Sequence, residues 1–163
     1  MIREFKGEHR WLSNFAPCKI MLDGEEYDSV ENAYQASKTL NHNERLKFKN
    51  ITPGQAKRLG RKITIRDDWS SVKLSNMYSL LIQKYANPPY KNMLIETGYM
   101  RIEEGNLWND TFWGVCLETG KGQNNLGKMI MEIRKNFYVF ETIFDDNFEA
   151  DIEHMNHIIN LTK

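Results

Sequence analysis

Residues 70–89, SSVKLSNMYSLLIQKYANPP, restrict the possible fold more than any other segment. Apolar side chains recur in this segment three and four residues apart, which places them on one side of an α-helix. The side chains of this stripe are Leu74, Met77, Tyr78, Leu81 and Tyr85. Asn87-Pro88-Pro89 would end such a helix. The segment therefore predicts a long helix in the core.

Capping residues and a second apolar stripe indicate further helices. Ser29 is a typical N-cap, Thr52 and Gln55 form a capping box around a proline, and Gly98 would close a helix. Helices are therefore expected over residues 30–40, 53–61 and 90–97. Another buried helix should begin near Asn124, and its apolar stripe consists of Leu126, Met129, Ile130, Ile133 and Phe137.

Strand signals are short and few. Asp23-Gly24 lies between two strand-like runs, as is typical of a tight hairpin, and residues 99–104 (YMRIEE) resemble another short strand. Because helices dominate, we expect a compact, helix-rich α+β fold with a few short antiparallel strands. One domain should span residues 1–140, followed by an acidic extension over residues 141–163 that ends in a helix.

The composition limits the functional class. Hydrophobic residues make up 40% of the chain and charged residues 27%, and no apolar run is long enough to cross a membrane, so no membrane partner is expected. The N-terminus lacks the apolar region of a signal peptide, and Cys18 and Cys116 are too few for a disulfide framework. A cytoplasmic location is therefore expected. The histidines lack zinc-ligand spacing, and we expect neither a metal nor a cofactor. The oligomeric state stays open.

Residues 113–123, WGVCLETGKGQ, look suited to holding a phosphate. The P-loop pattern G-x-x-x-x-G-K-[ST] does not fit, because five residues separate Gly114 from Gly120 and Gly122 takes the place of the hydroxyl residue. Gly120 and Gly122 would still let backbone amides approach a ligand near the positive end of the next helix. A plain glycine-rich turn would have the same sequence.

The expected helix over residues 30–40 carries a row of polar side chains. Glu31, Gln35 and Lys38 follow one another at about one turn's spacing on one face. Together they could grip a polar ligand and place a base beside it, although a solvent-exposed helical face would show the same pattern.

Two segments mix aromatic and polar residues. In RWLSNFAPC, residues 10–18, Ser13 and Asn14 precede Phe15, which suits a base that is both stacked and hydrogen-bonded. In LWNDTFWG, residues 107–114, aromatic side chains surround Asp110. Aromatic clusters are usually core, but an ionised carboxylate among them needs a partner or a function.

A run of cations follows in residues 57–66, namely Lys57, Arg58, Arg61, Lys62 and Arg66. Such a run could steer an anionic substrate or DNA, or it could simply face solvent. The net charge of the chain is zero, so attraction for nucleic acid would depend on a local patch of this kind. Nucleophilic hydrolysis is not indicated, because G-x-S-x-G is absent and Cys116 has no suggestive histidine.

Six motifs together resemble the YbiA-like family, also called NADAR. They occur in the family's order and spacing: LSNF, VENAYQASK, AKRLGR, DDWSSVK, WNDTFWG and GKGQNNLGKMIMEIR. The resemblance implies a compact, helix-rich α+β domain that hydrolyses N-glycosidic bonds. One branch of the family acts on ribosylaminopyrimidine phosphates of the riboflavin pathway, and another removes ADP-ribose from guanine in DNA.

The resemblance also implies roles for individual residues. Glu31 would orient or deprotonate water, Asp110 would be a second catalytic carboxylate, and Lys38 or Lys73 would hold phosphate or polarise the leaving group. Trp69 would stack on the base. The residues expected to contact the substrate are Ser13, Asn14, Phe15, Gln35, Trp69, Lys73, Trp113, Gly114, Gly122 and Asn124.

The Gly-Lys-Gly loop, residues 120–122, is expected to form the phosphate side of this pocket. Asn32 and Asn125 stand where riboflavin-type members often have histidine and arginine, which leaves the substrate open. We expect a phosphorylated, nucleoside-like small molecule. ADP-ribosylated guanine in DNA is one alternative, and binding of ADP-ribose or NAD without catalysis is another.

Overall fold

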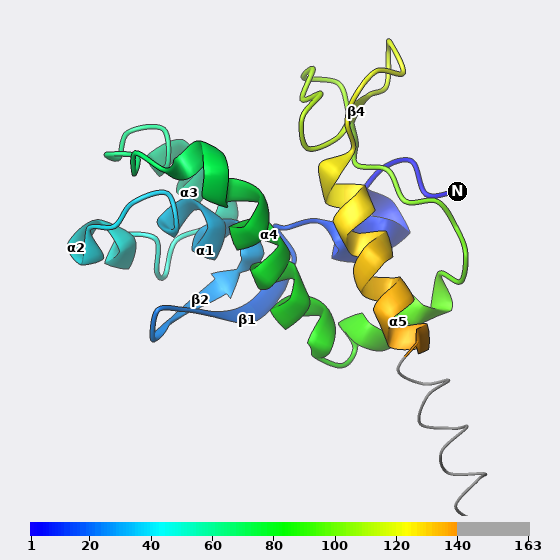
Figure 1. Ribbon diagram of the computed structural model, residues 1–163, viewed down its shortest axis with the longest axis horizontal. Helices are drawn as coiled ribbons and strands as arrows, with labels where there is room; N and C mark the ends of the chain where they lie inside the picture. Colours follow the sequence, from blue (N-terminus) through cyan, green and yellow to red (C-terminus); the bar gives the residue numbers. More distant parts are fainter. Residues whose placement is uncertain (140–163) are drawn as a thin grey trace, which may run out of the picture.

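The computed structural model describes residues 1–139 as a helix-rich α+β fold, and the expected acidic extension lies outside this range. In chain order the elements are η1 (Gly7–Leu12), β1 (Pro17–Leu22), β2 (Glu25–Ser29), α1 (Val30–Ala36), α2 (His42–Leu46), α3 (Pro53–Leu59), α4 (Trp69–Ala86), α5 (Tyr90–Glu96), β3 (Gly105–Asn106) and β4 (Val115–Cys116). A further helix covers residues 125–139. In Figure 1, α4 lies in the middle of the molecule. On one side of it are α1, α2, α3 and the hairpin of β1 and β2, and on the other is the helix over residues 125–139. No helix in the described range is long and apolar enough to cross a membrane.

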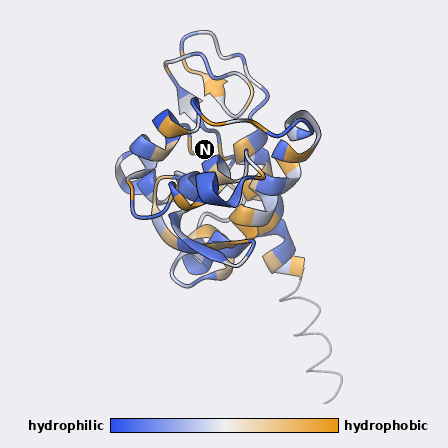
Figure 2. Ribbon diagram, turned by 90° about the vertical axis from the view of Figure 1, so that its left-hand side faces the viewer, coloured by the Kyte–Doolittle hydropathy of each residue, from blue (hydrophilic) through white to orange (hydrophobic). Residues whose placement is uncertain are grey.

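The two predicted stripes supply much of the core. On α4, Met77, Leu81 and Tyr85 are buried as expected, and on the helix over residues 125–139 Leu126, Ile130 and Ile133 are buried. Blue and orange alternate along the helices in Figure 2, as they should when each helix has one buried face. Leu74 differs from the prediction and is 39% exposed. In the same turns of α4, Trp69 and Lys73 line a cavity.

The predicted hairpin leads directly into α1. β1 and β2 pair antiparallel, and Asp23 and Gly24 have φ values of 49° and 83°, as a two-residue primed turn requires. Ser29 ends β2 and caps α1 by accepting a hydrogen bond from the Asn32 amide. The Asn32 side chain donates to the carbonyls of Phe48 and Ile51. The start of α1 is therefore fixed on both sides.

Three local predictions are corrected by the structure. α1 ends at Ala36 and does not continue to Leu40, because the amides of Lys38 and Thr39 bond three residues back and the chain turns toward α2. Residues 99–104 form no strand, and only Ile102 makes an isolated parallel bridge, to Ile2. β3 and β4 pair parallel rather than antiparallel, because residues 107–114 carry the chain back before β4 begins.

Candidate active site

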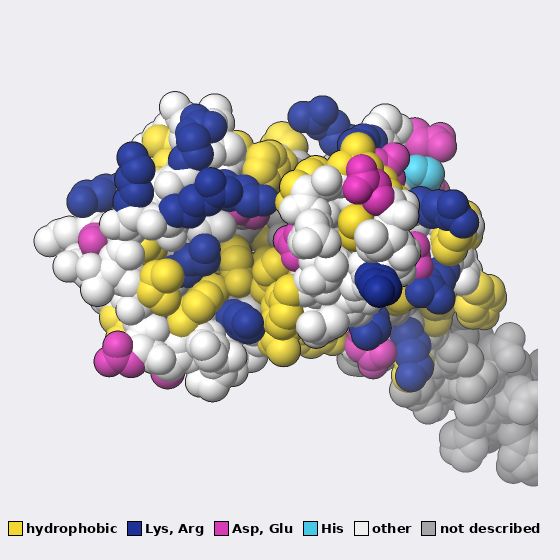
Figure 3. Space-filling model, turned by 90° about the horizontal axis from the view of Figure 1, so that it is seen from above, with side chains coloured by type: hydrophobic (Ala, Val, Ile, Leu, Met, Phe, Trp, Pro, Cys, Tyr) yellow, Lys and Arg dark blue, Asp and Glu magenta, His cyan; other side chains and the backbone are white. Residues whose placement is uncertain are grey.

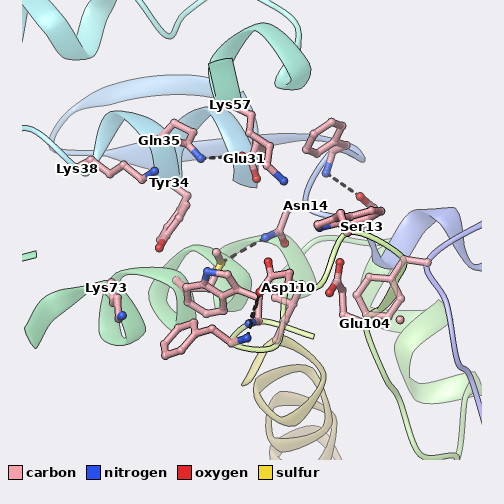
Figure 4. A pocket seen from close by; sticks show the side chains of 18 of the residues that line it. Ser13, Asn14, Glu31, Tyr34, Gln35, Lys38, Lys57, Lys73, Glu104 and Asp110 are labelled. Atoms are coloured by element: carbon pink, nitrogen blue, oxygen red, sulfur yellow. Dashed lines mark hydrogen bonds between the residues drawn. The ribbon is translucent and has the colours of Figure 1, made fainter. Parts of the chain in front are cut away.

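A cavity of about 640 Å³ opens between two walls that are distant in sequence. One wall comes from α1, α3 and the start of α4. The other comes from the N-terminal segment, residues 104–113 and the beginning of the helix over residues 125–139. Figure 4 shows acidic, basic and aromatic side chains pointing into the same space. The cavity is therefore assembled by the tertiary fold.

Glu31 enters the cavity from the first turn of α1. Its side chain is almost fully buried, and its Oε1 accepts a 2.8 Å hydrogen bond from Gln35 Nε2. Burial raises the pKa of the Glu31 carboxyl, while the Gln35 hydrogen bond and the charges of Lys57 and Lys38 act in the opposite direction. Glu31, Gln35 and Lys38 thus line the cavity together.

Cations line the same side of the cavity. Burial lowers the pKa of Lys38, whose Nζ lies 5.8 Å from the centre of the Tyr34 ring. Lys57 reaches the cavity from α3, and Lys73 reaches it from α4 with its Nζ 4.0 Å from the centre of the Phe112 ring. These ammonium groups can hold the negative charge of a phosphorylated ligand.

Glu104 is a second carboxyl group in the cavity, half-buried, and no local sequence pattern predicted it. It lines the cavity just before β3, and burial together with the nearby charge of Asp110 raises its pKa to about 7. Asn106 Nδ2 donates a long 3.4 Å hydrogen bond to its Oε2. A carboxyl group with this pKa can carry a proton at neutral pH and release it. Its position beside Glu103 gave no sign of burial.

Asp110 lines the cavity but is held by its own turn. Its Oδ1 accepts hydrogen bonds from the amides of Phe112 and Trp113, at 3.2 and 2.9 Å. Its backbone N–H and C=O are both bonded to the side chain of Asn106. The carboxylate therefore caps the turn over residues 110–113. This explains a carboxylate among aromatic residues without requiring a catalytic role.

Aromatic side chains also line the cavity. The Tyr34 ring lies between Trp69 and Trp113, with ring centres 5.2 and 5.6 Å away. Trp69 and Trp113 line the cavity, and Trp108 lines it with 61% of its surface exposed. Such faces can stack on a planar base.

Ser13, Asn14 and Phe15 also line the cavity, in the loop after η1. The Asn14 carbonyl accepts from the amide of Glu31 at 3.0 Å, so the loop is tied to α1. Asn14 Oδ1 is buried without a hydrogen-bond partner among the described residues. A buried unpaired acceptor beside a cavity suits a hydrogen-bond donor on a ligand.

The glycine-rich loop does not form part of the cavity wall, contrary to the prediction. Gly114, Gly122 and Asn124 are absent from its lining. A Cβ at Gly114 would overlap Glu104, and one at Gly122 would lie 2.7 Å from Val115 Cα, so these glycines permit close contact between chain segments.

The backbone amides at the start of the helix over residues 125–139 already have hydrogen-bond partners. The amides of Gln123, Asn125 and Leu126 donate to the carbonyls of Thr111, Phe112 and Trp113. The Asn124 side chain donates to the Ile102 carbonyl and accepts from the Glu104 amide. These groups are therefore unavailable to a phosphate, and they fix the segment that carries Glu104.

Comparison with known proteins identifies the family. A family model described as the NADAR domain matches residues 2–138. The chain belongs to the NADAR family. Its relatives in this family include N-glycosidase YbiA of Escherichia coli strain K12, which is 32% identical over 132 residues covering 78% of this chain and 81% of that protein. A riboflavin biosynthesis protein of Vibrio vulnificus is 33% identical over 78% of this chain but only 35% of its own length.

The NADAR fold is also seen in a solved structure. The NMR structure of the E. coli protein YbiA matches this chain with a TM-score of 0.75 at 29% identity, covering 86% of this chain and 85% of that one. The helix-rich arrangement is therefore shared with a NADAR relative.

Proposed function

We propose that the chain is an N-glycosidase that cleaves the bond between a base and a phosphorylated ribose, as in a ribosylaminopyrimidine phosphate. The main support is that Glu31, which is buried, and Glu104, which is half-buried, share one cavity with lysines and aromatic faces. Burial raises the pKa of both carboxyl groups. The names of the similar proteins, an N-glycosidase and a riboflavin biosynthesis protein, support the same reaction class.

Glu31 acts on the water that attacks the sugar. Cleavage of an N-glycosidic bond passes through a sugar with oxocarbenium character, and a nearby carboxylate both stabilises this cation and accepts a proton from water. Burial raises the pKa of Glu31, which makes its carboxylate a stronger base, and Lys38 and Lys57 favour its ionised form.

Glu104 supplies a proton to the departing base. A base leaves as a poor anion unless a ring nitrogen or carbonyl oxygen is protonated as the bond breaks. With a pKa of about 7, Glu104 retains its proton in much of the population at neutral pH. We assign this role to Glu104 in place of Asp110, because Asp110 Oδ1 already accepts two amide hydrogen bonds.

The remaining groups bind the substrate. Lys38, Lys57 and Lys73 hold the phosphate, and Trp69 presents an aromatic face to the base. Asn14 Oδ1 accepts from a hydroxyl or amino group of the ligand, which would give this buried oxygen its partner.

ADP-ribosylated guanine in DNA is a second candidate substrate. Arg58, Arg61 and Lys62 are exposed on and just after α3, the helix that brings Lys57 into the cavity. Figure 3 shows Lys and Arg side chains gathered over the part of the surface on the left, beside a hydrophobic hollow. Cations that extend outward from a cavity suit a substrate attached to a polyanion.

The two candidates are distinguished by assaying both substrates side by side with the purified full chain. Release of free pyrimidine and ribose phosphate, followed by chromatography, supports the proposal, whereas release of ADP-ribose from DNA alone supports the second candidate. No cleavage of either substrate, with calorimetric binding of ADP-ribose or NAD by the folded chain, would refute the enzyme and leave a binding module.

A further inference from the structure

Gly60 lies directly after α3, in a backbone conformation that does not require glycine. Its φ of −61° and ψ of −10° lie in the right-handed helical region, which every L-residue adopts readily. Alanine would usually be preferred there, since glycine costs more conformational entropy on folding. The reason for glycine must therefore lie in the space around its Cα atom.

That space is occupied by the Gln35 side chain. A Cβ atom at position 60 would overlap Gln35 Oε1 and lie 2.8 Å from Gln35 Cδ. Gln35 Oε1 is itself buried and has no hydrogen-bond partner among the described residues. The Gln35 amide is thus pressed against α3 by its oxygen, and its nitrogen points the other way, to Glu31 Oε1 at 2.8 Å.

We propose that Gly60 is a positioning residue for the catalytic base: by lacking a side chain, it seats the Gln35 amide in the one orientation that holds Glu31. This inference rests on the proposed function, in which Glu31 is the base. A methyl group at position 60 would push the flexible Gln35 side chain away from α3. Glu31 would then lose its donor while staying buried in the cavity.

Loss of the Gln35 hydrogen bond should change the pKa of Glu31. The Gln35 hydrogen bond lowers the pKa of Glu31 against the larger effect of burial. The other ionisable groups that face this carboxyl are Lys57 on α3 and Lys38 and Tyr34 on or next to α1. These would remain in Gly60→Ala, so the pKa of Glu31 should rise and the acid limb of the pH–rate profile should move to higher pH.

The test is a double-mutant cycle with a control from α3, the helix that Gly60 follows. Gly60→Ala and Gln35→Ala should each lower kcat/KM roughly ten- to a hundredfold. This factor corresponds to the free energy that a hydrogen bond to a charged group usually contributes. The double variant should be no worse than either single variant. Gly54→Ala is the control, because a Cβ there meets only Arg58 Nη1, at an ordinary 3.8 Å.

A measurement independent of activity accompanies the cycle. The Glu31 carboxyl is titrated by NMR in ¹³C-glutamate-labelled protein, with Glu31→Gln identifying its signal. A raised Glu31 pKa in Gly60→Ala and Gln35→Ala, but not in Gly54→Ala, supports the proposal. An unchanged pKa in Gly60→Ala, or kinetic losses that add in the double variant, would overturn it. An inactive wild type would refute the proposed function alone, since the titration still reports on Gly60.

Discussion

Replacing Glu104 by glutamine should make the chain more stable at neutral pH while impairing its chemistry. The folded carboxyl group ionises near pH 7, whereas its ordinary pKa is 4.5. Between these values the unfolded chain releases the proton first, so wild-type stability falls as pH rises toward 7. At 1.36 kcal/mol for each pKa unit, the loss reaches up to about 3 kcal/mol above pH 7. Glutamine has no proton to release, so the stability of Glu104→Gln should not fall with pH in this way.

The assay is urea unfolding of wild type and Glu104→Gln at intervals from pH 4.5 to 8. The stability advantage of the variant should be small at pH 4.5, grow with pH and level off above 7. Glu96→Gln, an exposed glutamate at the end of α5, is the matched control and should show no such growth. A constant difference between Glu104→Gln and wild type across this range would refute the assigned environment of Glu104.

Three further predictions test other parts of the site. Asp110→Ala should lower the unfolding free energy by about 1–2 kcal/mol in urea titrations, whereas Asp110→Asn should not, because the asparagine oxygen still accepts from the amides of Phe112 and Trp113. Gly122→Ala should lower the melting temperature, because its Cβ would collide with Val115. Its calorimetric affinity for ribosylaminopyrimidine phosphate should stay unchanged in the folded fraction, because Gly122 does not line the cavity. Cleavage of ADP-ribosylated DNA, if it occurs, should fall steeply with added salt while cleavage of the small pyrimidine hardly responds, and equal salt profiles would count against the α3 cations as a DNA track.

Local sequence signals predicted the elements that depend on neighbouring residues. The Asp23-Gly24 hairpin, the Thr52 capping box and the buried stripe on α4 all follow from turn chemistry or helical spacing. The row of Glu31 and Gln35 was also predictable, because residues four apart on a helix are neighbours.

The parts of the site that depend on distant segments were not predictable in this way. Glu104 is half-buried, and a loop containing Gly114 packs closely against it. No residue near Glu104 in the sequence predicts that contact. The helix that begins after Asn124 was expected to offer amides to a phosphate, but the carbonyls of residues 111–113 take them. Whether a backbone amide is free for a ligand is decided by tertiary contacts, which the local pattern does not contain.

The most direct test of the account is the turnover of Glu31→Gln on ribosylaminopyrimidine phosphate, with the melting temperature measured on the same sample. Glutamine keeps the shape of the side chain but cannot accept a proton, so turnover should fall by about 10²–10⁴-fold. Stability should be equal to or above that of wild type, because ionising a buried carboxyl group has a cost. Wild-type turnover in a normally folded Glu31→Gln would contradict the central claim that this carboxylate activates water.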